Sequence, residues 1–123
     1  MADQIVWLDM PTTDLARASK FYTGLLGAPV QYQEMDGMEF AMFPDAEKSV
    51  SGCLIPGTEE DILKRGALIY FNVDGRIVEA EQWAKDNGGE VLEPIHAIGP
   101  YGFRSVIHDS EGNRIALHSQ SNA

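Results

Sequence analysis

One pattern of secondary-structure signals occurs twice along the chain. In each half, an apolar segment is followed by a helical stretch and then by three segments of strand character. The two helical stretches also share an alanine, an aromatic residue and a glycine at the same spacing: Ala18, Phe21 and Gly27, then Ala80, Trp83 and Gly89. This spacing predicts an internal duplication. The chain is therefore expected to form two βαβββ modules of the α+β class, with eight strands and two helices.

The first module is expected at about residues 4–56. The apolar run Ile5-Val6-Trp7-Leu8 predicts a strand, which the segment from Pro11 to Asp14 breaks while offering helix-capping side chains. Apolar residues at helical spacing continue to Leu26, and Gly27 is suited to end that helix. Further strands are predicted at 30–35, 38–43 and 50–55, the first two joined by a hairpin at Asp36-Gly37.

A connector at about residues 57–66, with a short helical turn in it, leads to the second module at about 67–119. Asp74 is expected to cap a helix that ends at Gly88-Gly89. Strands are predicted at 67–73, 90–95, 102–108 and 113–119. Both modules would belong to a single domain over residues 1–123. A ferredoxin-like fold is an alternative, but it has too few strands between and after its helices.

Length and composition restrict the class of protein. At 123 residues the chain can bury a core of its own as one compact unit. A net charge of -10, from nineteen acidic and nine basic residues, argues against a nucleic-acid partner; it favours solubility or attraction of a cationic small molecule. No apolar run approaches the roughly 18 residues of a membrane span, and no signal peptide is evident. The single cysteine, Cys53, rules out an internal disulfide, and we expect a cytoplasmic protein.

Residues 107–118 are expected to form two strands joined by a tight turn. Gly112 and Asn113 tolerate the positive φ that such a turn needs. His108 and His118 lie one on each arm, so that they would face each other if the arms pair at those positions. We expect this hairpin to form part of the wall of a cavity.

The most specific motifs lie in the first helix and in this hairpin. They are Asp14-Leu15-x-Arg17-Ala18-x-x-Phe21-Tyr22-x-x-Leu25-Leu26-Gly27 and Asp109-Ser110-Glu111-Gly112-Asn113-Arg114-Ile115-x-Leu117. In these motifs the chain resembles the vicinal oxygen chelate superfamily, which includes glyoxalase I, fosfomycin-resistance enzymes, extradiol dioxygenases and bleomycin-binding proteins. The resemblance implies a glyoxalase-type open cavity of eight strands and a homodimer. It specifies the fold better than the activity, because the superfamily hosts many chemistries.

The resemblance also locates the positions that hold a divalent metal in the family. Members with metal activity place His or Glu on the first, fourth, fifth and eighth strands. Carried over to this sequence, three of these positions fall on Trp7, Leu68 and Ala116, and the fourth strand, 50–55, contains neither Glu nor His. An indole, an isobutyl group and a methyl cannot ligate a cation. The resemblance therefore implies that the usual metal site is absent; an atypical metal bound through His108 or His118 stays open.

The alternation of side chains along a strand then predicts which residues share the cavity face with Trp7, Leu68 and Ala116. The expected ligand pocket consists of Trp7, Asp9, Leu68, Tyr70, Asn72, Arg104, His108, Ala116 and His118. Arg104 is suited to an anionic or carbonyl group, or else to a salt bridge with one of the many acids. His118 is suited to act as a general base, or else to contact water at the end of its strand. Cys53, with no activating histidine near it in sequence, is expected to be a small core residue.

Two classes of function remain open. The first is an atypical lyase- or isomerase-like enzyme that acts on a small molecule without the usual metal. The second is a non-catalytic protein of the bleomycin-resistance type that binds or sequesters a small compound. A classical metal-dependent lactoylglutathione lyase is disfavoured, because the metal-ligand positions are occupied by Trp7, Leu68 and Ala116.

Overall fold

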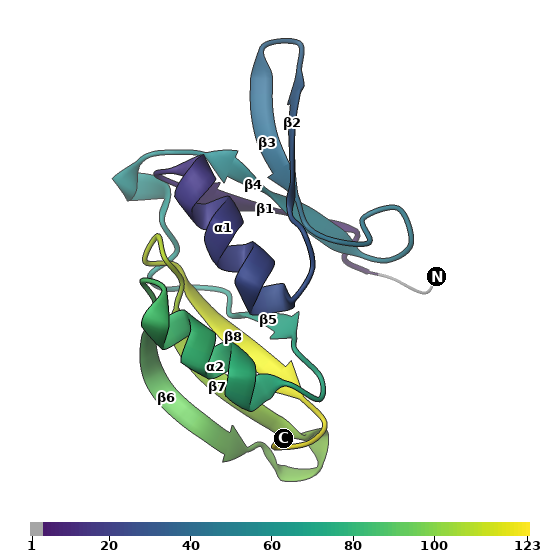
Figure 1. The fold of residues 1–123 in the computed structure, drawn as a ribbon, viewed down its shortest axis with the longest axis vertical. Coiled ribbons are helices and arrows are strands. Elements are labelled where there is room, and N and C mark those ends of the chain that lie inside the picture. The colour runs from purple at the N-terminus through teal and green to yellow at the C-terminus, as the bar shows by residue number, and fades with distance from the viewer. Residues whose placement is uncertain (1–3) are drawn as a thin grey trace.

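The structure, a computed structural model, describes residues 4–123 (Figure 1). The first half contains β1 (Trp7–Thr12), α1 (Leu15–Leu26), β2 (Gln31–Met35), β3 (Met38–Met42) and β4 (Ser51–Pro56). A 3-10 turn (Glu59–Asp61) lies in the connector. The second half contains β5 (Ile69–Asn72), α2 (Ile77–Asp86), β6 (Glu90–Ala97), a 3-10 turn (Gly99–Tyr101), β7 (Phe103–His108) and β8 (Arg114–Ser119).

The two halves form two mixed sheets with the same topology. The strand order is β1-β4-β3-β2 in the first sheet and β5-β8-β7-β6 in the second. In each sheet the first and last strands of the module pair in parallel, and the other neighbours are antiparallel. The predicted pair of βαβββ modules is confirmed. The strands after β1 begin and end within two residues of their predicted positions.

The signals predicted at the ends of α1 operate as expected. The Asp14 side chain accepts a hydrogen bond from the Arg17 amide at 3.0 Å and caps the first turn. Gly27 ends the helix in the left-handed region, at φ 70, where a residue without Cβ is favoured. The buried stripe between these ends consists of Ala18, Phe21, Tyr22 and Leu25. The helix therefore turns one apolar face toward the sheet.

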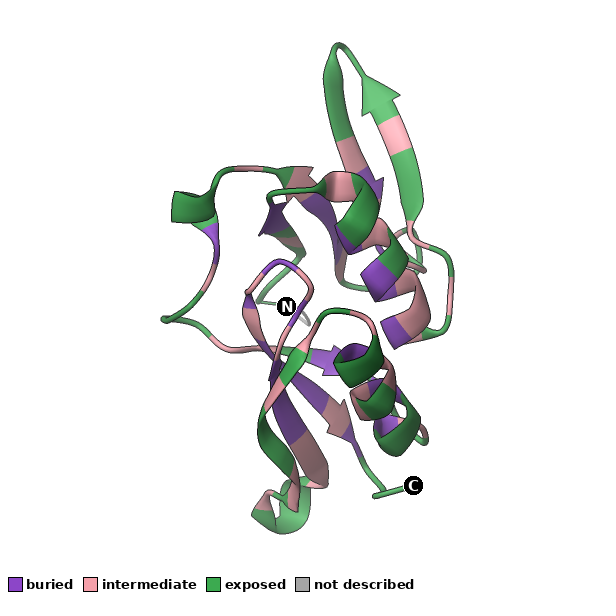
Figure 2. Cartoon of the chain, turned by 60° about the vertical axis from the view of Figure 1, so that its left-hand side comes forward, coloured by how far each residue is buried: buried purple, intermediate pink, exposed green. Residues whose placement is uncertain are grey.

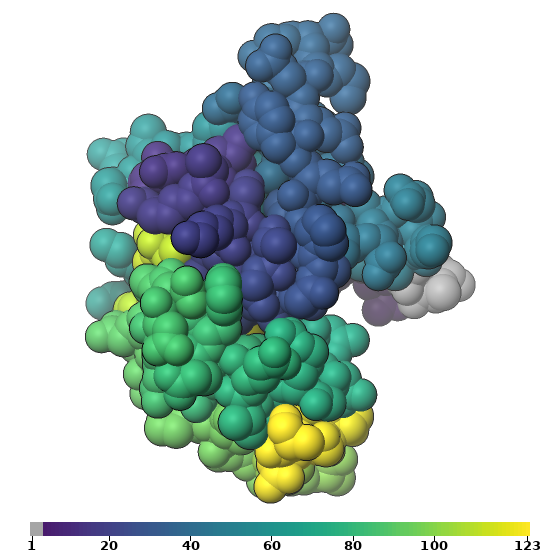
Figure 3. Space-filling view, viewed as in Figure 1, coloured from purple at the N-terminus to yellow at the C-terminus, as the bar shows by residue number. Residues whose placement is uncertain are grey.

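A single hydrophobic core joins the two modules. Helices α1 and α2 lie side by side on the same side of the molecule (Figures 1 and 3), and the Trp83 indole N–H on α2 donates to the Phe21 carbonyl on α1 at 3.1 Å. Beneath them the rings of Tyr22, Phe43 and Phe71 contact one another at centroid distances of 5.3 to 5.4 Å. Figure 2 shows the buried residues gathered on the strands and on the inner faces of the helices, with the β2–β3 hairpin exposed. Residues of both modules thus contribute to one buried core.

The turn between β7 and β8 fastens the second module to the start of α1. The Glu111 side chain is fully buried and accepts hydrogen bonds from the amides of Thr13 and Asp14, both at 2.9 Å, and from Arg17 Nε at 2.7 Å. Asn113 is also buried, and its amide N–H donates to the Pro11 carbonyl at 2.9 Å. Of the two residues that tolerate a positive φ, Gly112 adopts one, at φ 94, and Asn113 does not. The Asn113 side chain instead joins the modules.

Two local predictions are wrong. The first strand does not cover residues 5–8: it begins at Trp7 and runs through Pro11 to Thr12, and Val6 is 70% exposed. Proline is tolerated because β1 lies at the edge of the sheet, paired with β4 alone. Asp74 does not cap α2, whose N-cap is Arg76; the Asp74 carboxylate instead accepts from the Gln120 amide at 2.6 Å.

Candidate functional site

Each sheet has one face covered by its helix and one face left open. On β5 and β8, and just after β5, the residues that alternate with the predicted pocket residues are in the core or packed against it: Ile69, Phe71, Val73, Ile115 and Leu117. Leu8 on β1 packs against the same core. Because side chains alternate along a strand, the intervening residues face the opposite, uncovered side. The phase predicted for these strands is confirmed.

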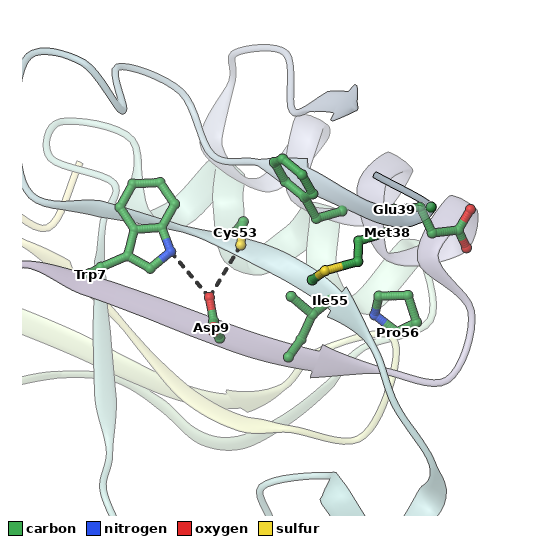
Figure 4. Close-up of a pocket in the computed structure, with 9 residues that line it drawn as sticks. Trp7, Asp9, Met38, Glu39, Cys53, Ile55 and Pro56 are labelled. Carbon is green, nitrogen blue, oxygen red and sulfur yellow. Dashed lines mark hydrogen bonds between the residues drawn. The ribbon is translucent and has the colours of Figure 1, made fainter. Parts of the chain in front are cut away.

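The uncovered face of the first sheet carries a hollow of about 590 Å³, here called the Trp7 hollow (Figure 4). Trp7 and Asp9 come from β1, three further residues come from the end of β4, three come from the start of β3, and Gly37 comes from the turn before β3. The full lining is Trp7, Asp9, Gly37, Met38, Glu39, Phe40, Cys53, Ile55 and Pro56. Most of these side chains are apolar. Two carboxylates, Asp9 and Glu39, are the exceptions.

Asp9 is held by its two neighbours on this face. The Trp7 indole N–H donates to Asp9 Oδ1 at 3.1 Å, and the Cys53 thiol donates to the same oxygen at 3.3 Å (Figure 4). The indole contact follows from spacing, because residues two apart on a strand share a face. Cys53 joins them because β1 and β4 pair in parallel with Asp9 beside Cys53. The carboxylate is thereby fixed in the wall of the hollow.

Cys53 is buried, as predicted for a small core residue, but it lies outside the core beneath the helices. Its thiol instead lines the Trp7 hollow. Burial, followed by the hydrogen bond to Asp9, raises the pKa of Cys53 to about 11. The group is therefore a protonated thiol at neutral pH, and it serves as a hydrogen-bond donor rather than a nucleophile.

The uncovered face of the second sheet carries a separate hollow of about 530 Å³, here called the Arg104 hollow. Its lining is Tyr70, Ile98, Tyr101, Arg104 and His118. Three of the nine predicted pocket residues, Tyr70, Arg104 and His118, thus lie together. Trp7 and Asp9 lie in the other hollow, and the two linings have no residue in common.

Arg104 is the centre of a polar network in its hollow. Its guanidinium donates to the Tyr70 hydroxyl at 2.6 Å and to His96 Nε2 at 3.1 Å, and it lies 3.7 Å from a Glu93 carboxylate oxygen. His96 Nδ1 lies 2.8 Å from the Pro94 carbonyl, which assigns the ring proton to Nδ1 and leaves Nε2 as the acceptor. The salt bridge considered from the sequence exists but is long. Because a guanidinium has five N–H donors and these hydrogen bonds use only two, the network can still donate to a carbonyl or anionic oxygen.

His96 is absent from the predicted pocket residues because in the sequence it lies near a loop and belongs to no motif. The structure pairs His96 on β6 with Arg104 on β7, which brings the two side chains together. A predicted β6 that reached Ala97 would have included His96. His96 could then have been placed opposite Arg104, since cross-strand partners share a face. The strand was predicted to end at 95, two residues too early.

The two hairpin histidines do not face each other. His108 pairs with Arg114, and His118 pairs with Arg104, so they are separated along the hairpin. His118 Nε2 lies 2.7 Å from the Tyr101 carbonyl, whereas His108 Nδ1 lies 3.1 Å from Glu90 Oε1. The arms do not pair at the positions that would have made the two histidines face each other.

The remaining predicted pocket residues line neither hollow. Ala116 is fully buried between Tyr70 and Val106 on the neighbouring strands. Leu68 precedes β5 and is half-buried, and Asn72 accepts a hydrogen bond from the Asp74 amide at 2.9 Å. His108, as described, contacts Glu90. These four side chains therefore stand apart from the two groups that the structure brings together.

The side chains at the family's metal-ligand positions do not fit a divalent cation. The Trp7 nitrogen is a hydrogen-bond donor already directed at Asp9, and Leu68 and Ala116 have no donor atom. Within residues 4–123, no three His, Cys, Asp or Glu side chains lie close enough together to hold a metal ion. The same residues include no helix that is both long and apolar enough to cross a membrane.

Known proteins match this chain along most of its length. Residues 4–117 match the sequence pattern of the Glyoxalase/Bleomycin resistance protein/Dioxygenase superfamily. A glyoxylase-like domain-containing protein from Didymella fabae is 33% identical over 126 residues, covering 93% of this chain and 91% of its own.

Two solved structures extend the comparison to the fold. A glyoxalase/bleomycin resistance protein from Albidiferax ferrireducens aligns with a TM-score of 0.66 at 16% identity, over 95% of this chain and 99% of that one. The fosfomycin resistance protein FosX from Listeria monocytogenes aligns with a TM-score of 0.70 at 16% identity, over 97% and 94% of the two chains. At this identity the likeness concerns the fold alone. Taken with the sequence match, it shows that the chain belongs to the glyoxalase/bleomycin resistance/dioxygenase superfamily and has its paired-module fold.

Proposed function

We propose that the protein binds a small organic molecule in the Trp7 hollow without the help of a divalent ion. One observation carries the proposal: at a position where metal-dependent members of the family place a ligand, this chain has Trp7, which lines an apolar hollow of about 590 Å³. Pockets of this size and lining are typical of small-molecule sites. An indole at the wall favours a ligand with a flat or apolar body.

A ligand screen in the presence of EDTA tests this proposal. Binding would be followed by tryptophan fluorescence and by thermal shift, first with the unchanged protein and then with Trp7→Leu. The matched control is Tyr101→Leu, which removes an exposed aromatic side chain from the Arg104 hollow instead. We expect compounds that bind the unchanged protein and the control but not Trp7→Leu. Binding that needs added Ni, Zn, Mn or Fe, or that survives the Trp7 change, would refute the proposal.

A second candidate is an atypical enzyme that uses the Arg104 hollow. The observation in its favour is the 2.6 Å hydrogen bond from Arg104 to the Tyr70 hydroxyl, with His118 in the same lining. Arg104 would hold a carbonyl oxygen, and Tyr70 or His118 would exchange a proton, as a lyase or isomerase requires. Turnover of a hemithioacetal, an epoxide or a diol that falls with Arg104→Met would support it. Absence of turnover on all three, with and without metals, would refute these activities.

We further propose that the protein is a cytoplasmic homodimer. Both hollows open to solvent, and modules of this superfamily commonly pair between chains to close a cavity. Light scattering on the purified protein should give a mass of about two chains of 13.5 kDa. A mass of one chain at micromolar concentration would refute the dimer, and recovery from a membrane or secreted fraction would refute the location.

A further inference from the structure

The Trp7 hollow combines one fixed carboxylate with an apolar wall. Asp9 Oδ1 accepts from both Trp7 and Cys53, while Oδ2 accepts no hydrogen bond from any of residues 4–123. A carboxylate oxygen that faces a hollow with a free lone pair is an acceptor for a ligand. The two protein donors hold the group in one orientation, so that a ligand meets a preorganised acceptor.

Trp7 adds a second attraction for positive charge. Its side chain is 41% exposed, and its N–H is directed at Asp9, so ring and carboxylate stand next to each other in the wall (Figure 4). The face of an indole attracts a cation more strongly than any other side-chain ring. A cation over the face of the indole, near its N–H edge, would be within reach of both the ring and the carboxylate.

The rest of the wall is suited to an apolar body. Met38, Ile55 and Pro56 lie on the side of the hollow away from Trp7, with Glu39 at its far edge (Figure 4). The Tyr32 hydroxyl donates to Glu39 at 2.9 Å and holds that carboxylate in place. Among the described residues, no lysine or arginine lines the hollow, and the whole chain carries a net charge of -10. An anionic ligand would therefore find no partner, whereas a cation would be attracted from a distance.

We propose that the Trp7 hollow is a site for a monovalent organic ammonium compound with an apolar or aromatic body. The ammonium lies against Asp9 and the Trp7 ring, and the apolar body lies over Ile55, Pro56 and Met38. This inference rests on the proposed function and specifies the chemical class of its ligand.

Three probes of similar size and different charge test it by isothermal titration calorimetry on the full chain, in low salt with EDTA. They are benzylammonium, benzyl alcohol and phenylacetate. We expect the cation to bind about tenfold more tightly than benzyl alcohol, and phenylacetate to bind most weakly. Raising the salt concentration should weaken the binding of the cation but not that of benzyl alcohol.

The critical variant is Asp9→Asn, which removes the charge but keeps an oxygen that accepts from Trp7 and Cys53. The matched control is Asp86→Asn, which makes the same change of charge at an exposed position on α2. We expect Asp9→Asn to weaken binding of the cation about fivefold or more and to leave binding of benzyl alcohol unchanged. Asp86→Asn should alter neither affinity appreciably. Circular dichroism confirms that each variant is folded.

The outcomes separate this inference from the proposed function. If benzyl alcohol and the cation bind equally and Asp9→Asn changes neither, the ammonium site is refuted while small-molecule binding at Trp7 stands. If phenylacetate binds most tightly, the charge argument is wrong in sign. If no probe binds and the wider screen finds no ligand that depends on Trp7, both proposals fail.

Discussion

Replacing Glu111 by glutamine tests whether one buried carboxylate holds the two modules together. Burial alone would raise the pKa of Glu111, but the hydrogen bonds from Arg17 and from the amides of Asp14 and Thr13 outweigh it and lower the pKa from 4.5 to about 2. A shift of this size corresponds to about 3 kcal/mol in favour of the folded state. Because Arg17 is 51% exposed, water screens part of the interaction. We therefore expect Glu111→Gln to lower the free energy of unfolding by about 2 kcal/mol at pH 7.

The pH dependence gives a second and more specific result. A carboxylate with a lowered folded-state pKa stabilises the protein fully above its unfolded value of 4.5 and loses that effect as the pH falls toward 2. The difference between the unchanged protein and Glu111→Gln should thus be constant from pH 6 to 8 and fall by more than half at about pH 3. Urea unfolding followed by fluorescence measures both.

The control is Glu79→Gln on α2. Glu79 also pairs with an arginine, Arg76, at 3.3 Å, but its side chain is 73% exposed. An exposed pair of this kind contributes about 0.5 kcal/mol or less. The reasoning is refuted if Glu111→Gln costs no more than Glu79→Gln, or if its cost is the same at pH 3 as at pH 7.

Three further changes probe the packing and the sites. Gly24→Ala should destabilise the protein by about 2 kcal/mol in urea unfolding, although alanine favours helices, because a Cβ there would overlap the Trp83 ring. The destabilisation should be smaller in a Trp83→Leu background. Tyr22→Phe should cost about 1–3 kcal/mol in the same assay, because its hydroxyl donates to buried Asp109 at 2.6 Å. Alkylation of Cys53 by iodoacetamide at pH 8 should be about a hundredfold slower than that of a free thiol and rise with pH toward its pKa of about 11, since only the thiolate reacts; a rate equal to the free thiol's would refute the assignment.

Features that depend only on residues close together in sequence were predicted correctly. The Asp14 cap, the Gly27 end of α1 and the Asp36-Gly37 hairpin each depend on residues within one turn, and each is where the sequence predicts it. The same rules misplaced β1. Ile5 and Val6 are as apolar as residues of a buried strand, but the pairing of β1 with β4 begins only at Trp7, opposite Ser51. Pairing with a distant strand, rather than hydropathy, sets that boundary.

Contacts between the modules lay beyond the reach of local patterns. Glu111 and Asn113 were recognised as parts of a motif, but nothing near them in sequence indicates that they bind Thr13 and Pro11. Asp74 shows the converse case: it has the chemistry of a helix cap, yet the chain after β8 offers it the Gln120 amide, and α2 begins without it. A buried polar group needs a hydrogen-bond partner, and the partner can come from a part of the chain that only the folded structure brings close. Sequence spacing alone does not identify that partner.

The candidate site combines both lessons. Alternation correctly set the phase of the strands, and with it the grouping of Trp7 with Asp9 and of Tyr70 with Arg104. It did not reveal that the two groups line different hollows, because that depends on how the sheets sit relative to each other. Replacing a metal ligand by Trp7 removes a donor atom, but the carboxylate two residues further on keeps a free oxygen beside the indole. This negative charge next to an aromatic face is the reason for proposing an organic cation, and not a metal, as the ligand of the Trp7 hollow.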